Sequence, residues 1–261
     1  MLDGLRLATG LLTIFPVKPP AEINSGTARA AMLLAPLAVL PLALVAALAG
    51  WGSVLIGLPA VLAAVVVVAV VVLGTRAMHL DGLADTVDGL GSGRDREQAL
   101  QIMKAGDIGP MGVIALVLVL LTQVLAASVL LARPWGWVEL ALLLVMSRAA
   151  LLFGCVTGVP AARPDGLGAM VAGSVPVGAA VAWWLFLGGG AAVAAGLAGQ
   201  PFWLPLVGMM VAVVVAFGLV QAAIKRFGGI TGDVLGALVE LAATVLLLVA
   251  AAGSPPVVVA G

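Results

Sequence analysis

The sequence predicts an all-α protein that crosses a membrane several times. Hydrophobic residues make up 63% of its 261 residues, charged residues make up only 9%, and the mean hydropathy is +1.26. Apolar runs long enough to cross a bilayer recur along the whole chain. Together these observations predict a polytopic transmembrane helical bundle of about seven spans, forming a single integral membrane domain over residues 1–261.

The expected elements follow the apolar runs in chain order. The first run, roughly Leu5 to Val17, is too short for a comfortable span, so we expect a short N-terminal interfacial or re-entrant helix there. The longer runs that follow are rich in small residues, which suit close packing in lipid within one bundle or between copies, so a homo-oligomer stays open. The expected spans are roughly Ala31–Ala49, Val54–Thr75, Val113–Leu131, Val138–Val156, Val171–Gly189, Leu204–Ala222 and Val234–Ala251.

Charge and cysteine content exclude several classes of protein. Twelve basic and twelve acidic residues balance, so the net charge does not favour a nucleic-acid partner. The single cysteine, Cys155, lies in an apolar run. A lone cysteine excludes an internal disulfide and a metal site built from cysteines.

The basic residues set the expected orientation in the membrane. By the positive-inside rule, the N-terminus and an acidic-motif segment at about 76–112 are cytoplasmic, and the C-terminus is outside. Arg133 alone falls in a connection on the outer side. We therefore expect a multi-pass protein of a bacterial cytoplasmic (inner) membrane, with the lipid bilayer as its partner. The basic residues on the cytoplasmic side are Arg6, Lys18, Arg29, Arg76, Arg94, Arg96, Lys104, Arg163, Lys225 and Arg226.

One stretch, Met78–Gly91, puts three carboxylates into a chain that otherwise has few charges. At about 100° per residue, a helix would place Asp81, Asp85 and Asp88 within roughly 60° of one another. Like charges at this spacing repel, and a divalent cation is their natural compensation. Oxygen ligands favour Mg²⁺, and an ion held by a few carboxylates keeps positions open for substrate phosphates. The motif therefore predicts a magnesium site for diphosphate chemistry.

One other interpretation of the three acids stays open, and so do two roles for His79. The acids could merely decorate a solvated loop, although Gly82 and Gly89 beside two of them, and the flanking spans, favour the metal site. His79 lies two residues before Asp81 and faces away from it on an ideal helix. An acid/base role and a structural role are therefore both open for His79.

The segment after the motif has the features of a ligand-binding connection. A turn at Gly91–Gly93 is followed by residues 94–104, which have the charge pattern of a short surface helix. The glycine-rich stretch Gly106–Gly112 then leads into the next span. Glycines let backbone amides approach a ligand closely, and Lys104 is placed to hold a phosphate, with a plain flexible turn as the alternative.

Two charged residues fall well inside spans, away from their ends, where charge is costly. Arg148 lies near the middle of the fourth span, so we expect it to contact substrate or an acid, with a structural salt bridge as the alternative. Glu240 lies two turns into the last span and is its candidate partner. Just before it, Thr231 or Asp233 is expected to cap the last helix, where loop amides would form an anion site.

The acidic motif also carries a resemblance to a known family. His79–Gly91, followed by Arg94, Ile102–Lys104 and Ile108-Gly109, closely resembles the signature of the cobalamin-5′-phosphate synthases, also called adenosylcobinamide-GDP ribazoletransferases. The resemblance extends to the blocks at residues 162–168 and 228–237, with Glu240, and so covers most of the chain in matching order.

The resemblance implies the last assembly step of vitamin B12 synthesis, in which adenosylcobinamide-GDP is joined to α-ribazole or its 5′-phosphate and GMP is released. A ribose hydroxyl attacks the phosphorus that carries cobinamide. In this interpretation Mg²⁺ held by Asp81, Asp85 and Asp88 bridges the diphosphate, and a motif aspartate or His79 takes the hydroxyl proton. Contacts with substrate or phosphate are then expected from Lys104, Arg94, Asp107, Arg148, Arg163, Thr231, Asp233 and Glu240.

The chain departs from the family pattern after Lys104. The family usually carries an acid directly after this lysine and a basic residue two positions later, whereas this chain has Ala105, Gly106 and Asp107. The displaced acid is therefore expected at Asp107.

Three other functions fit parts of the pattern. A membrane prenyltransferase would show a second Asp-rich cluster, where this chain has Asp233 and Glu240. A CDP-alcohol phosphotransferase shares the Asp-Gly start and the reaction logic, but its next elements do not fit Ala84-Asp85. An ion-coupled transporter would place ionisable residues near the midplane, as Arg148 and Glu240 are, but would often show repeated halves, and the sequence shows none.

Overall fold

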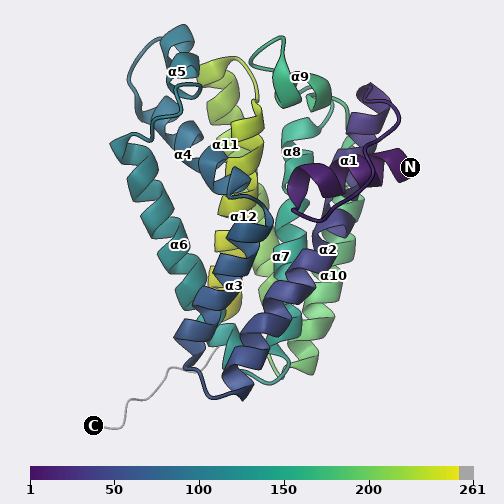
Figure 1. Cartoon of the computed structure of the whole chain (residues 1–261), viewed down its shortest axis with the longest axis vertical. Coiled ribbons are helices and arrows are strands. Elements are labelled where there is room, and N and C mark those ends of the chain that lie inside the picture. Colours follow the sequence, from purple (N-terminus) through teal and green to yellow (C-terminus); the bar gives the residue numbers. More distant parts are fainter. Residues whose placement is uncertain (253–261) are drawn as a thin grey trace.

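A computed structural model, which describes residues 1–252, confirms the all-α prediction. The helices pack side by side into one elongated bundle, and the long ones run along its length (Figure 1). In the described part of the chain, extended segments are joined by two isolated β-bridges. The helices are α1 (Leu2–Leu12), α2 (Ser25–Leu55), α3 (Ala60–Gly74), α4 (Met78–Gly91), α5 (Arg96–Ile102), α6 (Pro110–Leu131), α7 (Gly136–Arg148), α8 (Leu151–Cys155), α9 (Gly166–Val171), α10 (Val177–Leu197), α11 (Leu204–Phe227) and α12 (Gly232–Ala252).

The prediction of about seven spans is confirmed. Within the described residues, α2, α6, α10, α11, α12 and the pair α7 and α8 are long and apolar enough to cross a membrane. A seventh segment is formed if α3 and α4 count as one bent span. By itself α3 has 15 residues. At 1.5 Å per residue it is about 22 Å long, less than the ~30 Å hydrocarbon core of a bilayer.

Two of the predicted spans begin too early in the chain. The span expected from Val54 begins at Ala60, because α2 continues through Val54 and a turn follows in which Gly57 has a φ of +94°. The span expected from Val171 begins at Val177, because Val171 is the last residue of the short α9. Both turns lie in apolar sequence, and hydropathy measures apolarity rather than backbone direction.

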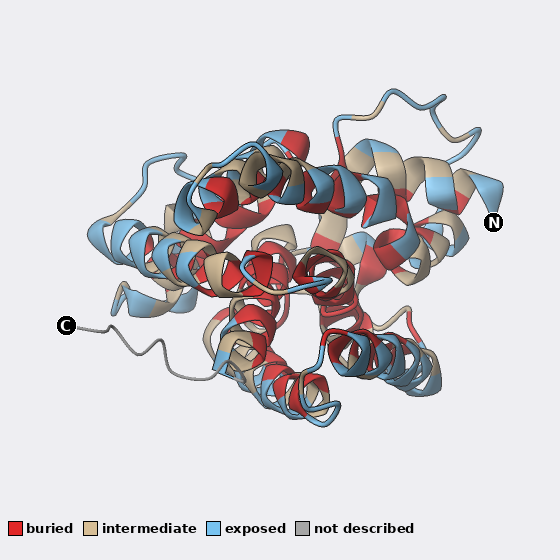
Figure 2. Cartoon of the chain, turned by 90° about the horizontal axis from the view of Figure 1, so that it is seen from below, coloured by how far each residue is buried: buried red, intermediate tan, exposed pale blue. Residues whose placement is uncertain are grey.

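Side-chain size separates a tight interior from an apolar exterior. Buried positions face the inside of the bundle and exposed positions face outward (Figure 2). The interior is rich in alanine, and a Cβ at Gly50 in α2 would collide with Val67 in α3. The outer face carries large apolar side chains such as Leu118, Phe186 and Val214, which are 60%, 71% and 70% exposed. Small residues inside and large apolar residues outside are typical of helices that pack together in lipid.

A sharp bend between α3 and α4 turns α4 across one end of the bundle (Figure 1). The two helices are bent by 86°, and Arg76 and Ala77 at the bend both have a φ of 55°, which residues other than glycine rarely adopt. The Arg76 guanidinium donates hydrogen bonds to the carbonyl oxygens of Gly10 (3.0 Å), Leu11 (2.9 Å) and Thr13 (2.8 Å). The bend therefore also fixes α1, which covers residues 2–12 rather than the expected 5–17.

Replacing Ala77 with glycine should stabilise the protein. A left-handed backbone costs a residue with a Cβ roughly 1–2 kcal/mol, more than the entropy that glycine loses on folding. We expect Ala77→Gly to raise the midpoint of thermal unfolding in detergent by roughly 2–4 °C. The matched control is Ala182→Gly on the exposed face of α10, where glycine should lower the midpoint. A lower midpoint for Ala77→Gly would show that the bend is not strained.

Candidate functional site

The site is built around a close crossing of α4 and α12. A Cβ at Gly82 would lie 2.7 Å from the carbonyl oxygen of Asp233, and a Cβ at Gly236 would lie 3.1 Å from that of His79. The first distance leaves no room for a side chain, and the second is tighter than most real contacts. Glycine at both positions lets the two backbones approach, which brings the acidic face of α4 against the first turn of α12.

A second pair of segments closes over the same end. The connection that follows α8 and the one that precedes α12 form a parallel β-bridge between Ala161 and Ile230. The Ile230 amide donates to the Pro160 carbonyl, and the Ala162 amide donates to the Ile230 carbonyl, both at 2.9 Å. Blocks 162–168 and 228–237, far apart in the chain, are thus in direct contact. This contact carries Arg163 to the acidic side chains, where its charge acts on Asp85.

Asp85 experiences the negative charge of its neighbours most strongly. Burial, and then the charges of Asp81, Asp233 and Asp88, raise the pKa of the Asp85 carboxyl to about 7. Among the described residues, Arg163 is the charge that acts in the opposite direction. A bound cation would remove this excess of negative charge, and oxygen donors of this kind favour a hard ion such as Mg²⁺.

The carboxylates do not form a complete metal cage. Within residues 1–252, no three His, Cys, Asp or Glu side chains are placed to hold a metal ion together. Mg²⁺, however, is usually bound by one or two protein carboxylates, with water and substrate phosphates in the other positions. Asp81, which is exposed, and Asp85, which is half-buried, fit such an open arrangement.

Asp88 contacts the chain differently from the other two motif aspartates. Its side chain is 8% exposed, its Oδ2 accepts a hydrogen bond from the Gly109 amide at 2.7 Å, and its Oδ1 accepts one from the Gly112 amide at 2.9 Å. These amides belong to the start of α6, so Asp88 caps that helix and holds the glycine-rich connection. We expected the backbone amides of this glycine-rich stretch to approach a ligand. At Gly109 and Gly112 they instead donate hydrogen bonds to a carboxylate of the chain itself.

His79 is buried beside a cavity near the acids. It is 2% exposed, and neither ring nitrogen has a hydrogen-bond partner in the described part of the chain. Burial, and then the charge of Arg148, lower the pKa of His79 to about 3, so its ring is neutral. With Asp81 and Asp233, it lines an otherwise largely apolar cavity of about 260 Å³. His79 and Asp81 thus both border one cavity, which extends around the first turn of α4 toward α12.

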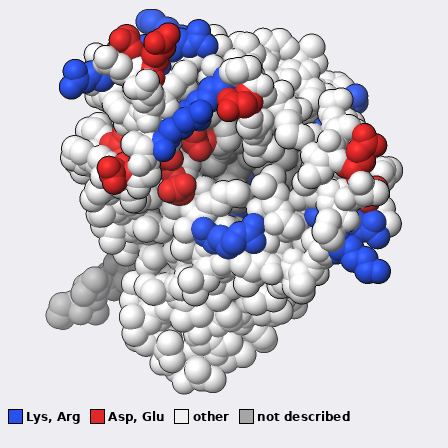
Figure 3. All heavy atoms as spheres, turned by 45° about the horizontal axis from the view of Figure 1, so that its top comes forward, with Lys and Arg blue, Asp and Glu red and all other residues white. Residues whose placement is uncertain are grey.

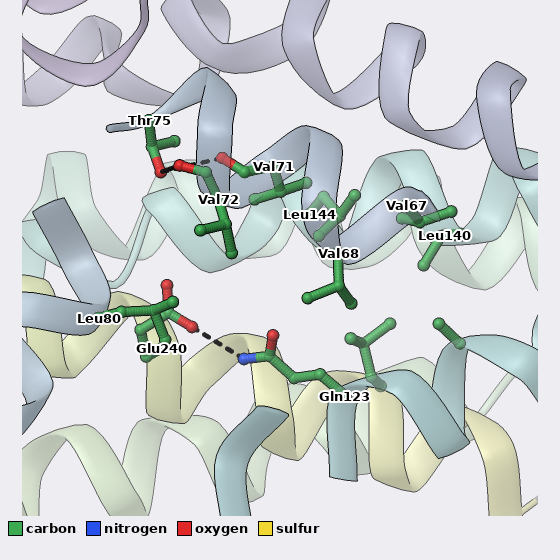
Figure 4. Close-up of a pocket in the computed structure, with 12 residues that line it drawn as sticks. Val67, Val68, Val71, Val72, Thr75, Leu80, Gln123, Leu140, Leu144 and Glu240 are labelled. Atoms are coloured by element: carbon green, nitrogen blue, oxygen red, sulfur yellow. Dashed lines mark hydrogen bonds between the residues drawn. The ribbon is translucent and has the colours of Figure 1, made fainter. Parts of the chain in front are cut away.

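Arg148 and Glu240 lie deeper in the bundle and are not in direct contact. Nη1 of Arg148 donates to the Leu144 carbonyl at 3.1 Å and to Ser147 Oγ at 2.8 Å, while its Nε and Nη2 have no partner among residues 1–252. Glu240 Oε2 instead accepts from Gln123 Nε2 at 2.8 Å (Figure 4). Glu240 and Gln123 line a cavity of about 20 Å³, which has room for about one water molecule. Among the described residues Arg148 and Glu240 therefore form no salt bridge, although their charges act on each other, because a polar side chain of α6 binds Glu240.

Thr231 caps the last helix. Its Oγ1 accepts a hydrogen bond from the Val234 amide at 3.3 Å and donates one to Asp233 Oδ2 at 3.1 Å. A Cβ at Gly168 would lie 2.8 Å from the Ile230 carbonyl, so α9 packs directly on this turn. The cap therefore fixes both the start of α12 and the carboxylate of Asp233.

The other predicted contacts lie on the connection between α4 and α6. Lys104, Arg94 and Asp107 are all exposed there. Asp107 and Asp88 line a second cavity of about 380 Å³ at the C-terminal end of α4. Charged side chains of both signs gather toward this end of the molecule, and most of the remaining surface in that view is uncharged (Figure 3).

Two arginines that the sequence analysis did not assign to the site hold its segments together. Arg96 Nη2 donates to the Ala162 carbonyl at 3.1 Å, and its guanidinium occupies the space that a Cβ at Gly228 would need. Arg226 Nη2 donates to Ser92 Oγ at 3.1 Å. The glycine at position 228 was the available signal, because it marks a close approach, but it does not identify the approaching side chain.

Comparisons with known proteins cover nearly the whole chain. A family model described as cobalamin-5-phosphate synthase matches residues 4–251. A protein of Nocardioides sp. named adenosylcobinamide-GDP ribazoletransferase is 43% identical over 97% of this chain and 100% of its own length. Proteins of the same name from Frankia casuarinae and Bradyrhizobium diazoefficiens are each 39% identical, over 98% and 97% of this chain and 96% and 94% of their own. No solved structure matches the chain.

Gly82→Ala should weaken the crossing of α4 and α12. The added Cβ would meet the backbone of Asp233, which cannot move aside as a flexible side chain can. We expect the free energy of unfolding to fall by about 1–3 kcal/mol, measured as a lower midpoint of thermal unfolding in detergent. The control is Gly218→Ala in α11, where an added Cβ meets nothing within 4 Å and alanine favours the helix. Equal midpoints for the two variants would contradict the close crossing.

Proposed function

The chain belongs to the cobalamin-5-phosphate synthase family, and we propose that it is a membrane transferase that joins adenosylcobinamide-GDP to α-ribazole, or to its 5′-phosphate, and releases GMP. The name that its relatives share supports this pair of substrates. The observation that carries the proposal is the meeting of Asp81, Asp85, Asp233 and Arg163 at one end of an apolar bundle. Carboxylates gathered beside an arginine suit a substrate that brings a diphosphate and its metal ion.

The proposed step is a substitution at phosphorus. A ribose hydroxyl oxygen of the acceptor forms a bond to the phosphorus that carries cobinamide, and the bond from that phosphorus to the bridging oxygen of GMP breaks. GMP leaves with the electron pair of this bond, and the hydroxyl proton passes to a basic group of the site. Asp81 borders the cavity beside α12 and is the candidate for that group, whereas burial lowers the pKa of His79 to about 3 and makes its ring a weak base.

We propose Mg²⁺ as the metal ion of this reaction. Asp81 and Asp85 would hold it with Asp233 beside them, whereas both oxygens of Asp88 are hydrogen-bonded to the start of α6. When bound, the ion supplies positive charge to the diphosphate. The crowding of carboxylates around Asp85, which Arg163 opposes alone, supports this assignment.

Basic side chains near the acids are proposed to orient the diphosphate. Arg163 Nη2 donates to the Leu100 carbonyl at 2.9 Å, and its buried Nε has no partner among the described residues. A guanidinium presents several donors in a plane that matches phosphate oxygens. Lys104 and Arg94, both exposed, can reach phosphates from the solvent side. Arg148 is only 1% exposed, so a direct substrate contact by this residue is not part of the proposal.

The charge distribution supports an orientation in the membrane. The helices make this a multi-pass membrane protein by length and composition, and we propose that the end bearing α4 faces the cytoplasm of a bacterium. Lys and Arg side chains gather toward that end (Figure 3). Arg133 lies at the other end, where its Nη2 donates to the Ala250 carbonyl at 3.0 Å. An excess of basic residues on one side is the usual mark of the cytoplasmic side.

In the presence of Mg²⁺, purified protein in detergent or lipid should convert adenosylcobinamide-GDP and α-ribazole into GMP and a new corrinoid, both measured by chromatography. EDTA should abolish both products and added Mg²⁺ should restore them, because the proposed ion balances the charge of the diphosphate. If folded protein releases no GMP under these conditions, the proposed activity is wrong. If both products form equally well with EDTA, the metal assignment is wrong and the transferase assignment stands.

Asp85→Asn should mainly lower activity, whereas Asp88→Asn should mainly lower stability. Asp85→Asn removes a proposed metal ligand and a source of repulsion, so we expect activity to fall about 100-fold or more while the unfolding midpoint stays the same or rises. Asp88→Asn weakens the cap of α6, so we expect a loss of about 1 kcal/mol of stability and a lower midpoint. Near-normal turnover by Asp85→Asn would contradict its place in the metal site.

A further inference from the structure

We propose that the cavity between α1, α4 and α12 binds the aromatic base of the acceptor nucleoside, and that His79 donates a hydrogen bond to the free ring nitrogen of that base. This inference rests on the proposed function and assigns a place to one of its two substrates. It makes His79 a specificity-determining residue, distinct from the carboxylates that hold the metal ion.

The cavity has the size and the walls of a site for a flat apolar ring. Its volume is about 260 Å³, near the lower end of the roughly 300–1,000 Å³ usual for small-molecule sites, so it accepts a bicyclic ring and excludes a corrinoid. Most of its walls are apolar, and the methionines among them adapt to the shape of a ligand. The apolar lining comes from Leu11 and Leu12 of α1, Met32 of α2, Leu151 of α8 and Leu167 of α9.

His79 supplies the polar contact that such a site needs. His79 is 2% exposed and is one of the residues that border the cavity, and neither of its buried ring nitrogens has a hydrogen-bond partner in residues 1–252. A buried polar group without a partner is costly, and a ligand that binds it removes that cost. An imidazole ring carries at least one N–H donor. The base of α-ribazole is a benzimidazole, which is joined to ribose through one ring nitrogen and keeps the other nitrogen as a hydrogen-bond acceptor. The imidazole ring of His79 and this base are therefore complementary.

The position of the cavity connects this base to the reaction. The same cavity is bordered by Asp81 and Asp233, so a base beside His79 directs its ribose toward the carboxylates. The second cavity lies at the opposite end of α4 and is lined by Asp88, whose oxygens are both hydrogen-bonded to backbone amides. At Asp88, the second cavity therefore offers no buried polar group that still needs a hydrogen-bond partner. The cavity beside His79 is the better site for the base.

Protection of an introduced cysteine tests where the base binds. The natural Cys155 is 0% exposed, so a maleimide should label the unmodified protein slowly. Leu11→Cys places a thiol in the wall of the proposed site, and Ile108→Cys places one in the second cavity. We expect α-ribazole alone, at about ten times its Kd, to slow the labelling of Leu11→Cys about tenfold and to leave Ile108→Cys unchanged.

Protection of Ile108→Cys alone, equal protection of both variants or protection of neither would overturn the proposed location. The labelling needs neither the GDP-linked donor nor turnover. A protein that forms the corrinoid product but shows no protection at Leu11→Cys therefore contradicts this inference alone. Protection at Leu11→Cys without any product supports the site and contradicts the proposed reaction.

Substrate preference tests the role of His79. The probe is an α-ribosyl indole, in which a C–H group replaces the free ring nitrogen of the base. Because a site that hydrogen-bonds a substrate discriminates against an analogue that lacks the group, wild-type protein should favour α-ribazole at least about tenfold in kcat/KM. In His79→Phe this preference should fall to within about twofold, with the KM for adenosylcobinamide-GDP unchanged, and His79→Gln, which keeps an N–H donor, should recover part of it.

The ratio of the kcat/KM values for the two acceptors does not change when part of the protein is unfolded. A general structural effect of the substitution would therefore not alter this ratio. A lower kcat in His79→Phe with the tenfold preference intact would overturn the proposed hydrogen bond and favour an acid/base or structural role. Loss of the preference in both His79→Phe and His79→Gln, without a change in unfolding midpoint, would overturn the assignment of an N–H donor to this side chain.

Discussion

The close contact between α4 and α12 is the constraint on which the rest of the site depends. Two helix backbones can approach this closely only where side chains are absent, and Gly82 and Gly236 meet that condition. Between helices in lipid there is little hydrophobic driving force, so close packing and hydrogen bonds provide most of the association. The contact fixes where α4 lies along α12, and with it the approach of Asp85 to Asp233. One methyl group at this crossing would therefore affect both the fold and the chemistry.

The number of spans and the position of the acidic helix could be predicted from the sequence because hydropathy and helical period record them directly. The bend before α4 could not, because Arg76 and Ala77 are neither glycine nor proline. Their left-handed backbone is held by hydrogen bonds from Arg76 to carbonyl oxygens at the C-terminal end of α1 and just after it, among them Gly10 and Thr13. A conformation that depends on residues more than sixty positions away leaves no local signal in the chain.

The roles of individual site residues were predicted less well, because they depend on partners distant in the sequence. Asp85 and Asp88 look alike in the motif, yet the carboxylate of Asp88 is bound by two amides of α6 and that of Asp85 is crowded by other acids. Opposite charges in two spans suggested an ion pair between Arg148 and Glu240, but Gln123 binds the glutamate. A single amide in an apolar run gives little signal, since neither its charge nor its spacing distinguishes it.

The position of α4 between two cavities also accounts for the incomplete metal site. One cavity lies beside Asp81 and the other beside Asp88. A helix of 14 residues is about 21 Å long, so ligands bound at its two ends approach each other over its middle, near Asp85. In the proposed reaction, an acceptor that enters from one end and a diphosphate that enters from the other would share the proposed ion there. An ion fully enclosed by protein ligands would leave no position for either substrate, so a two-substrate transferase requires carboxylates that bind its metal only in part.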